Sequence, residues 1–252
     1  IAIKKNIIAS LFLKSISILV SLQVVPLTIN YINPTRYGIW LTLSSIVAWL
    51  SYFDLGFAHG FRNRFAEAVA KGDMQLAREY VSTTYVVLSL LFSGVFLIAI
   101  VVNHFVDWSA ILNVDAAYSS ELNIVFGILA FFFCLNIVAS IFTTMLTANQ
   151  KPALASLIQT LGQVFGFICI YVLTKTVPGN LDVLAFAFSG VPCFLLIIIS
   201  IGMFLSGRYR HLSPSFHFVH FSLTKKIVGL GGQFFIIMIS MLFVFQLINI
   251  VI

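Results

Sequence analysis

The sequence predicts an all-α membrane protein whose chain crosses the bilayer several times. Of its 252 residues, 60% are hydrophobic and only 9% are charged, whereas roughly a quarter of the residues in a soluble domain carry a charge. The apolar residues are gathered in runs of about 20, the length that a helix needs to cross a membrane. Helices are expected because backbone polar groups in lipid must be satisfied within the segment, and because these runs are too long and too uniformly apolar for barrel strands.

The sequence contains seven such runs, and we expect each to form a transmembrane helix. Because the chain begins with Ile1 rather than Met and stops at Ile252 inside an apolar run, we expect it to be a piece of a longer protein. The first run is too long for the core of a signal peptide, so it is expected to remain as an uncleaved helix. The expected spans are Ile7 to Ile32, Gly38 to Phe57, Tyr80 to Val102, Leu122 to Ala148, Ala153 to Thr174, Val183 to Leu205 and Ile227 to Ile252.

Basic residues gather on one side of these spans. Eleven fall on the side of the N-terminus and two, Arg36 and Lys175, on the other, while Lys14 lies within the first span. Since cytoplasmic loops are enriched in Lys and Arg, we expect a cytoplasmic N-terminus. Topology and anionic lipids then account for the net charge of +6, and no nucleic-acid partner is expected. The eleven are Lys4, Lys5, Arg62, Arg64, Lys71, Arg78, Lys151, Arg208, Arg210, Lys225 and Lys226, and the acidic residues expected outside are Asp107, Asp115, Glu121 and Asp182.

One long polar stretch, Asp54 to Asp73, separates the second span from the third. Its apolar residues recur at every fourth position, so they share one face of a helix. Glu67 and Lys71 form an i,i+4 pair on the polar side. Gly72 is suited to end this helix, and Asp73 is suited to cap the next one. The stretch therefore predicts a cytoplasmic helical hairpin, whose apolar face consists of Phe57, Phe61, Phe65 and Val69.

The sequence carries no catalytic, cofactor or metal motif that we recognise. The three cysteines, Cys134, Cys169 and Cys193, are isolated inside predicted spans, so neither a disulfide nor a cysteine metal site is expected. His217 and His220 could share a helix face, but no carboxylate or cysteine lies near them in sequence to complete a metal site. We therefore expect a protein that is not an enzyme and that holds no cofactor or metal.

Two stretches resemble a known family. The first is "YINPTRYGIWLTLSSIVAWLSYFDLGFAHGFRNRFAEAVAKGD", Tyr31 to Asp73, and the second is "LTANQKP", Leu146 to Pro152. Both are similar to segments of polysaccharide and O-antigen flippases, a family of the multidrug/oligosaccharidyl-lipid/polysaccharide exporter superfamily. Members commonly carry a tyrosine-glycine pair before the second helix and a "DLG...G.RN..AEA.AKGD" loop after it.

This resemblance implies a fold of twelve or more helices in two six-helix lobes around a central cavity. Residues 1–210 would then form the N-terminal six-helix lobe, and residues 211–226 a cytoplasmic linker between the lobes. Residues 227–252 would be the first helix of a C-terminal lobe that the chain truncates. "KKNIIASLFLKSISIL" near the start and "KKIVGLGGQFFIIMIS" from Lys225 have similar openings, as an internal repeat would require.

The resemblance also implies a function. A flippase moves undecaprenyl-pyrophosphate-linked oligosaccharide units across the bacterial inner membrane for O-antigen or other surface polysaccharide. The expected partners are this lipid-linked oligosaccharide, membrane lipids and a polysaccharide polymerase.

Such a substrate needs a sheltered polar path with positive charge. Lys14 is one candidate cation, because serines at helical spacings around it suggest a polar stripe, although snorkelling to the interface explains it equally well. Arg62 and Arg64 are candidates for receiving the pyrophosphate, or they pair with Asp54, whose depth in the membrane calls for a partner. Gln23 could bind sugar hydroxyls or join helices. The serines are Ser10, Ser17 and Ser21; Gln159 is a further polar residue of the same kind as Gln23.

Three other functions are weighed against this one. A cation-coupled multidrug exporter of the same fold needs carboxylates inside its spans, and no Asp or Glu falls in the interior of a predicted span. A membrane glycosyltransferase or ligase needs a catalytic loop. The longest outer loop, Asn103 to Glu121, offers only His104, Asp107 and Asp115. A seven-helix receptor would have its N-terminus outside, against the charge bias.

Overall fold

The computed structural model describes residues 2–48, 56–229, 231–233 and 240, with side chains from residue 6 onward. Throughout this part of the chain the backbone forms helices and short connections, and it contains no β-strand. Five of the described helical segments are long and apolar enough to span a membrane. These observations confirm the predicted fold class, an all-α polytopic membrane protein.

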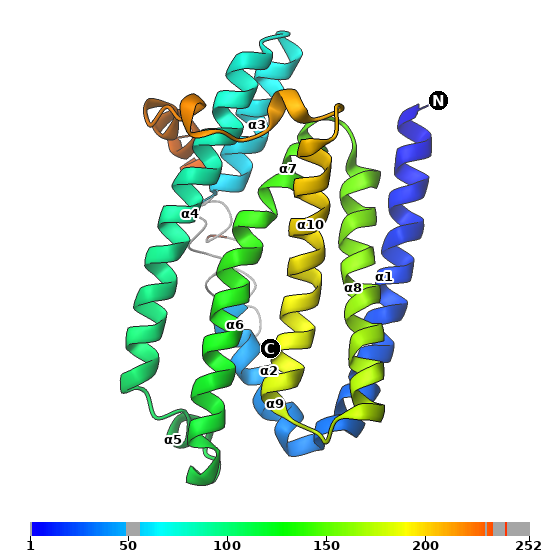
Figure 1. Ribbon diagram of the computed structural model, residues 1–252, viewed down its shortest axis with the longest axis vertical. Coiled ribbons are helices and arrows are strands. Elements are labelled where there is room, and N and C mark those ends of the chain that lie inside the picture. Colours follow the sequence, from blue (N-terminus) through cyan, green and yellow to red (C-terminus); the bar gives the residue numbers. More distant parts are fainter. Residues whose placement is uncertain (1, 49–55, 230, 234–239, 241–252) are drawn as a thin grey trace.

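The labelled helices are α1 (Ala2–Ile32), α2 (Pro34–Ala48), α3 (Phe57–Ala70), α4 (Met74–Phe105), α5 (Trp108–Leu112), α6 (Ser119–Ala139), α7 (Ile141–Ala148), α8 (Pro152–Thr176), α9 (Leu181–Ala185) and α10 (Val191–Leu205). Residues 222–229 are helical as well. The long helices stand side by side in the order α4, α6, α10, α8 and α1 (Figure 1). α2 lies against α6 and α1, while α3 packs on α4 and α7 at one end of the layer. Short 3₁₀ turns occur at Ala116–Tyr118, Arg210–Leu212 and Phe216–Phe218, and a π-helical segment occurs at Phe186–Gly190.

Five of the seven predicted spans correspond to membrane-length helices. For the second predicted span, Gly38 to Phe57, α2 begins earlier, at Pro34, and is described as far as Ala48. The rest of that span before Gly56, and most of the seventh, Ile227 to Ile252, lie outside the described residues. The five confirmed spans are Asn6–Ile32, Met74–Phe105, Ala116–Ala148, Pro152–Thr176 and Leu181–Leu205.

The fourth span is divided at Ser140, where α6 ends and α7 begins. The Ser140 hydroxyl donates to the carbonyl of Ile137 at 2.7 Å. The hydroxyls of Thr143 and Thr144 donate back to the carbonyl of Ser140, at 2.9 and 3.0 Å. Such side-chain bonds to helix carbonyls compete with the regular backbone pattern and often bend a helix. The predicted continuous helix Leu122 to Ala148 is therefore two consecutive helices.

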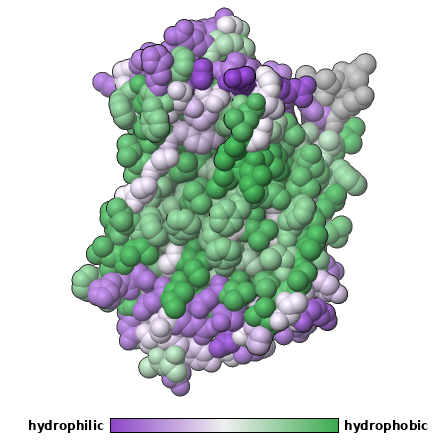
Figure 2. Space-filling view, in the orientation of Figure 1, coloured by the Kyte–Doolittle hydropathy of each residue, from purple (hydrophilic) through white to green (hydrophobic). Residues whose placement is uncertain are grey.

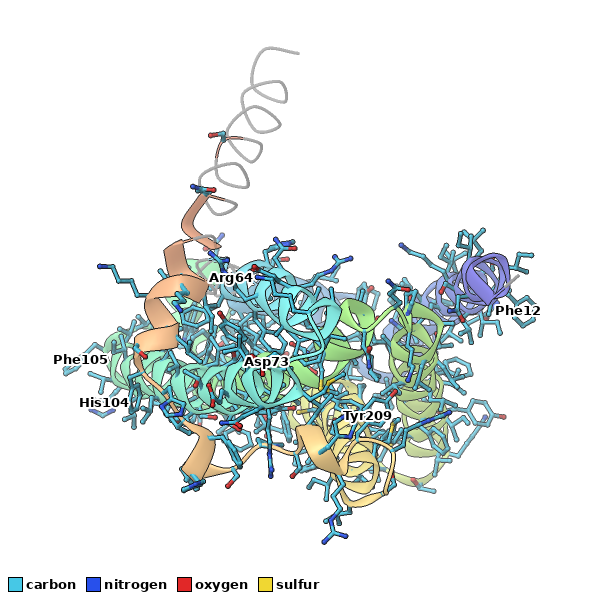
Figure 3. All side chains as sticks on the ribbon, turned by 90° about the horizontal axis from the view of Figure 1, so that it is seen from above. Phe12, Arg64, Asp73, His104, Phe105 and Tyr209 are labelled. Carbon is cyan, nitrogen blue, oxygen red and sulfur yellow. The ribbon has the colours of Figure 1, made fainter. Side chains whose placement is uncertain are left out.

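The outside of the bundle is apolar along most of its height. Figure 2 shows a wide hydrophobic band across the visible face, between hydrophilic residues at both ends. Large apolar side chains of the long helices are exposed, for example Phe12 of α1 at 67% and Leu97 of α4 at 65%. Phe12 projects away from the other helices (Figure 3). A surface of this kind is suited to contact with hydrocarbon rather than water.

Buried apolar side chains fill the contacts between helices in two clusters. One cluster joins α3, α4 and α7 to the connection after α10 and contains Phe61, Phe65, Phe142 and Tyr209. The other joins α2, α6, α8 and α9 toward the opposite end and contains Leu43, Trp108, Leu122 and Leu181. Because each cluster takes residues from segments far apart in sequence, the helices are held in one defined arrangement.

The two ends of the bundle carry different charges. We call the end with the N-terminus, α3 and the α7–α8 turn the basic end (Figure 1). The described basic residues predicted for the N-terminal side lie toward this end, and Arg36 and Lys175 lie toward the other. There Arg36 donates through Nη1 to the carbonyl of Gly179 at 3.0 Å and pairs through Nη2 with Glu121 at 3.5 Å. Arg36 thus connects the first turn of α2 to α6 and to the α8–α9 connection.

The polar stretch forms the predicted helical hairpin at the basic end. α3 ends beside Gly72, whose φ of +76° is a left-handed conformation that glycine adopts without strain. The Asp73 carboxylate accepts a hydrogen bond from the N–H of Leu76 at 2.9 Å and caps α4. α4 then continues without interruption into the third span, as expected from the sequence.

The two faces of α3 are also those predicted. Phe57, Phe61 and Phe65 are buried on one side. On the other, Lys71 Nζ lies 2.7 Å from an oxygen of Glu67. This hydrogen bond and a second one from Arg64 hold the pKa of the Glu67 carboxyl below its usual value. The carboxylate is therefore ionised and pairs with both cations across the exposed side of the hairpin.

We expect Asp73→Ala to lower the free energy of unfolding of the detergent-solubilised protein by about 1 kcal/mol, because α4 loses its N-cap acceptor. Asp73→Asn keeps an acceptor oxygen in the same place and should unfold close to the wild type. Thermal unfolding followed by circular dichroism measures both, and equal losses for the two variants would contradict the capping role.

Candidate functional site

A polar cavity of about 320 Å³ lies near the basic end, between α3, α7 and α8. α3 contributes His59 and Arg62, α7 contributes a group of threonines, and α8 contributes its first two turns. We call it the basic-end cavity. Its lining residues are Ala58, His59, Arg62, Thr143, Thr144, Thr147, Pro152, Ala155, Ser156 and Gln159.

α3 places Arg62 at this cavity because the apolar side of the helix is buried against other helices. Phe61 and Phe65 are fully buried against α4 and α7. Arg62 is exposed and makes no hydrogen bond or ion pair with the part of the chain that the structure describes. Its guanidinium is therefore available, with five N–H donors and a permanent positive charge.

The threonines of α7 supply hydrogen-bond acceptors, in contrast to the donors of Arg62. The hydroxyls of Thr143 and Thr144 both donate to the carbonyl of Ser140, and that of Thr147 donates to the carbonyl of Thr143 at 2.9 Å. A hydroxyl has a single hydrogen, so each of these can only accept a further hydrogen bond from a ligand. The same bonds that divide the fourth span thus orient a row of acceptors.

α8 begins at the edge of the cavity, with Pro152 in its first turn. The N-terminal end of a helix carries a partial positive charge, which adds to the charge of Arg62. Ser156 and Gln159 follow along the helix and can both donate and accept. The cavity therefore combines donors and positive charge with several acceptors that lack a free hydrogen, and none of the described residues that line it is acidic.

The two arginines of the predicted site have different roles. They are two positions apart, so they leave α3 on nearly opposite sides. Arg64 Nη1 lies 3.0 Å from Glu67, and its Nε donates to the carbonyl of Lys226 at 3.4 Å. Figure 3 shows Arg64 beside the segment that follows α10. Arg64 is therefore paired with Glu67. The predicted pairing of these arginines with Asp54 stays a prediction, because Asp54 lies outside the described residues.

The stripe around Lys14 is partly a helix contact. Ser17 Oγ lies 3.0 Å from Thr160 Oγ1 of α8, so this serine joins α1 to α8 instead of facing open space. Ser10 Oγ is buried and has no partner among the described residues, while Ser21 borders a deeper cavity. Lys14 itself is exposed and makes no hydrogen bond or ion pair within the described chain. Its role in a substrate path stays a prediction.

Gln23 is exposed on α1 as well, but on another face. Nine residues separate it from Lys14, which corresponds to about 180° around a helix of 3.6 residues per turn. The two side chains therefore leave α1 in opposite directions and do not border one path along this helix.

The threonines of α7 are not among the residues that the sequence predicted for the site. They lie inside a run that reads as an apolar span, where Thr is an unremarkable residue. The available signal was their spacing, since Thr143, Thr144 and Thr147 occupy positions i, i+1 and i+4 and share a helix face just before "LTANQKP".

Two less polar cavities lie farther into the bundle. One of about 260 Å³ lies between α1, α2, α8 and the π-helical segment, and another of about 240 Å³ lies between α2, α6 and that segment. Trp40 and Phe188 border both, with their rings edge to face at 5.2 Å. π-helical turns often occur at functional sites, and this one places Phe188 between two open spaces.

Comparisons with protein-family models, with curated proteins and with solved structures find no match for this chain.

A double-mutant cycle tests whether the serine stripe joins α1 to α8. Ser17→Ala and Thr160→Ala should show a coupling of about 0.5–1 kcal/mol in thermal unfolding, because hydroxyl pairs between membrane helices have energies of this order. Ser15, whose hydroxyl donates to its own helix at Leu11, provides the control. Ser15→Ala should show no coupling to Thr160→Ala, and an uncoupled Ser17 would mean that it faces a cavity or lipid.

Proposed function

We propose that the protein is part of a flippase for undecaprenyl-pyrophosphate-linked oligosaccharides in the bacterial inner membrane, serving the synthesis of O-antigen or another surface polysaccharide. In this proposal the N-terminus and the basic end face the cytoplasm, where the positive-inside rule places them. The described helices belong to the N-terminal lobe, which binds the headgroup and rocks against a second lobe to expose it outside. The protein translocates its substrate and catalyses no covalent step.

The observation that carries the proposal is the chemistry of the basic-end cavity. A pyrophosphate-linked oligosaccharide presents anionic oxygens that only accept and sugar hydroxyls that can donate. Arg62 matches the first group, and the acceptor oxygens of Thr143 and Thr147 match the second. A cation about 4 Å from a phosphate charge gains roughly 4 kcal/mol at an effective dielectric of 20. The resemblance of Tyr31 to Asp73 to flippases supports the same conclusion independently.

A cation-coupled drug exporter fits the described cavity less well. Such a protein binds cations through carboxylates inside its spans, and the described lining of the basic-end cavity includes no carboxylate. The described carboxylates of the spans, Glu79, Glu121 and Asp182, lie near helix ends.

The outer loop also gives little support to a glycosyltransferase. Asp107 caps α5, accepting from the N–H of Ser109 at 3.0 Å, and Asp115 accepts from the N–H of Ala117 at 2.9 Å. Hydrogen bonds, first from the Ser109 hydroxyl and then from backbone N–H groups, lower the pKa of Asp107. Both carboxylates therefore serve as caps rather than as a general acid.

Arg62→Gln should weaken binding of the lipid-linked oligosaccharide about 10- to 100-fold, because a hydrogen bond to a charged group contributes roughly 1.5–3 kcal/mol. Arg62→Lys should keep part of the affinity. Arg64→Gln, from the same helix but outside the cavity, is the matched control and should bind normally. Binding to the full-length protein in nanodiscs measures this, and a normal affinity for Arg62→Gln would remove the cavity from the substrate path.

Thr147→Val keeps the shape of the side chain but removes an acceptor. Binding of the glycosylated pyrophosphate should weaken about 3- to 10-fold, corresponding to one hydrogen bond of about 1 kcal/mol, whereas undecaprenyl pyrophosphate without sugars should bind unchanged. Thr174→Val, at the far end of α8, provides the control. An equal loss with both ligands would mean that Thr147 acts through the fold rather than through the sugar.

A further inference from the structure

After α10 the chain stays in contact with the bundle. Residues 206–221, which we call the strap, run across the basic end and around the outer edge of α4 (Figures 1 and 3). The strap is almost perpendicular to the long helices, so it lies roughly in the plane of the membrane that they would span. The sequence predicted residues 211–226 as a linker and did not indicate this course.

Hydrogen bonds hold the strap against α4. The N–H of Ser215 donates to Ser82 Oγ at 3.1 Å, and the N–H of His220 donates to Thr83 Oγ1 at 3.0 Å. Arg78 Nε donates to the carbonyl of Ser213 at 2.9 Å. These bonds satisfy backbone groups at several points along the strap, so its course is defined by the fold.

Buried side chains anchor its first half. Tyr209 and Leu212 are each 1% exposed. The Tyr209 hydroxyl accepts a hydrogen bond from Lys151 Nζ at 3.0 Å. Farther along, the Arg78 guanidinium lies over the ring of Phe218 at 4.2 Å. His220 Nε2 also lies 3.7 Å from Glu79 of α4. Contacts with the bundle therefore hold both halves of the strap.

The strap lies at the level of the membrane interface. From Thr83 to the end of α4 at Phe105 the helix rises about 33 Å, at 1.5 Å per residue. The hydrocarbon core of a bilayer is about 30 Å thick. If the far end of α4 reaches one boundary of the core, then Ser82 and Thr83, and the strap bound to them, lie at the other.

The outer surface of the strap combines aromatic and basic groups. Phe216 is 86% exposed and Phe221 is 62% exposed. Arg208 and Arg210 are exposed too, and residues 206–221 contain no Asp or Glu. Exposed aromatic rings beside cations are typical of segments that lie in the interface, with the rings in the acyl region and the cations at the headgroups.

We infer that the strap is a binding surface for anionic phospholipid in the leaflet at the basic end. Phe216 and Phe221 enter the outer part of the acyl region, and Arg208 and Arg210 contact headgroup phosphates. The strap thereby ties the position of α4 to the charge of that leaflet. This inference does not depend on what the protein transports.

The first test measures depth. Phe216→Trp in the full-length protein, reconstituted in nanodiscs, should add fluorescence that phospholipids brominated on their acyl chains quench and that aqueous iodide does not. The matched control is Ala70→Trp, on the exposed tip of the α3–α4 hairpin, whose added fluorescence should respond only to iodide. In both cases the emission gained over the parent protein is compared.

Iodide quenching of the Phe216→Trp emission would place the strap in water and overturn the inference. Protection from both quenchers would overturn it as well, because the aromatic surface would then be covered by protein.

The second test measures the dependence on headgroup charge. Phosphatidylglycerol should raise the melting temperature of the full-length wild type relative to phosphatidylcholine alone, and Arg210→Gln should lose a substantial part of that shift. Lys71→Gln removes the same charge from the hairpin tip and should keep it. An Arg210→Gln shift equal to that of the wild type, or an equal loss in Lys71→Gln, would show that the strap does not recognise anionic lipid.

Discussion

Charged side chains are costly in hydrocarbon unless a partner or ligand compensates them, and this constraint organises the whole bundle. The long helices expose apolar residues such as Phe12 and Leu97 along their middle. The described charges are gathered toward the two ends, where some of them form ion pairs. Arg36 pairs with Glu121 at the end opposite the hairpin. At the basic end Glu67 pairs with Lys71 and Arg64. Lys14 is the exception within a span.

The basic-end cavity shows how a small disturbance of a helix can create a polar site inside an apolar fold. Ser140 and the threonines after it use their hydrogens on helix carbonyls, which divides one long span into α6 and α7. The hydroxyl oxygens are left facing a space that α3 and α8 also border. Because their hydrogens are already committed, these threonine hydroxyls can bind only a ligand group that donates. Arg62 makes the cavity complementary to an anion as well.

α4 is linked to both the hairpin and the strap. α4 is continuous with the hairpin through Asp73, it contacts α3 and α6, and it carries the strap on Ser82 and Thr83. A displacement of α4 would therefore move one wall of the basic-end cavity, through α3, together with a surface at the membrane interface. In the proposed flippase, this arrangement would couple the proposed headgroup site to the lipid around it.

The sequence by itself determined the fold class, five of the spans, the division of charge and the α3–α4 hairpin, because these follow from the local constraints of hydropathy, helical spacing and capping at Gly72 and Asp73. It also selected Arg62, which lines the basic-end cavity, as a candidate, but it did not distinguish Arg62 from Arg64. Only the tertiary structure decided that Arg64 is paired, that Ser17 contacts α8, that the α7 threonines line a cavity, and that residues 206–221 bind α4. The contacts of Arg64 with Lys226, of Ser17 with Thr160 and of Ser215 with Ser82 join segments more than 100 residues apart. The cavity likewise requires α3, α7 and α8 to meet, and local pattern carries no information about which segments meet.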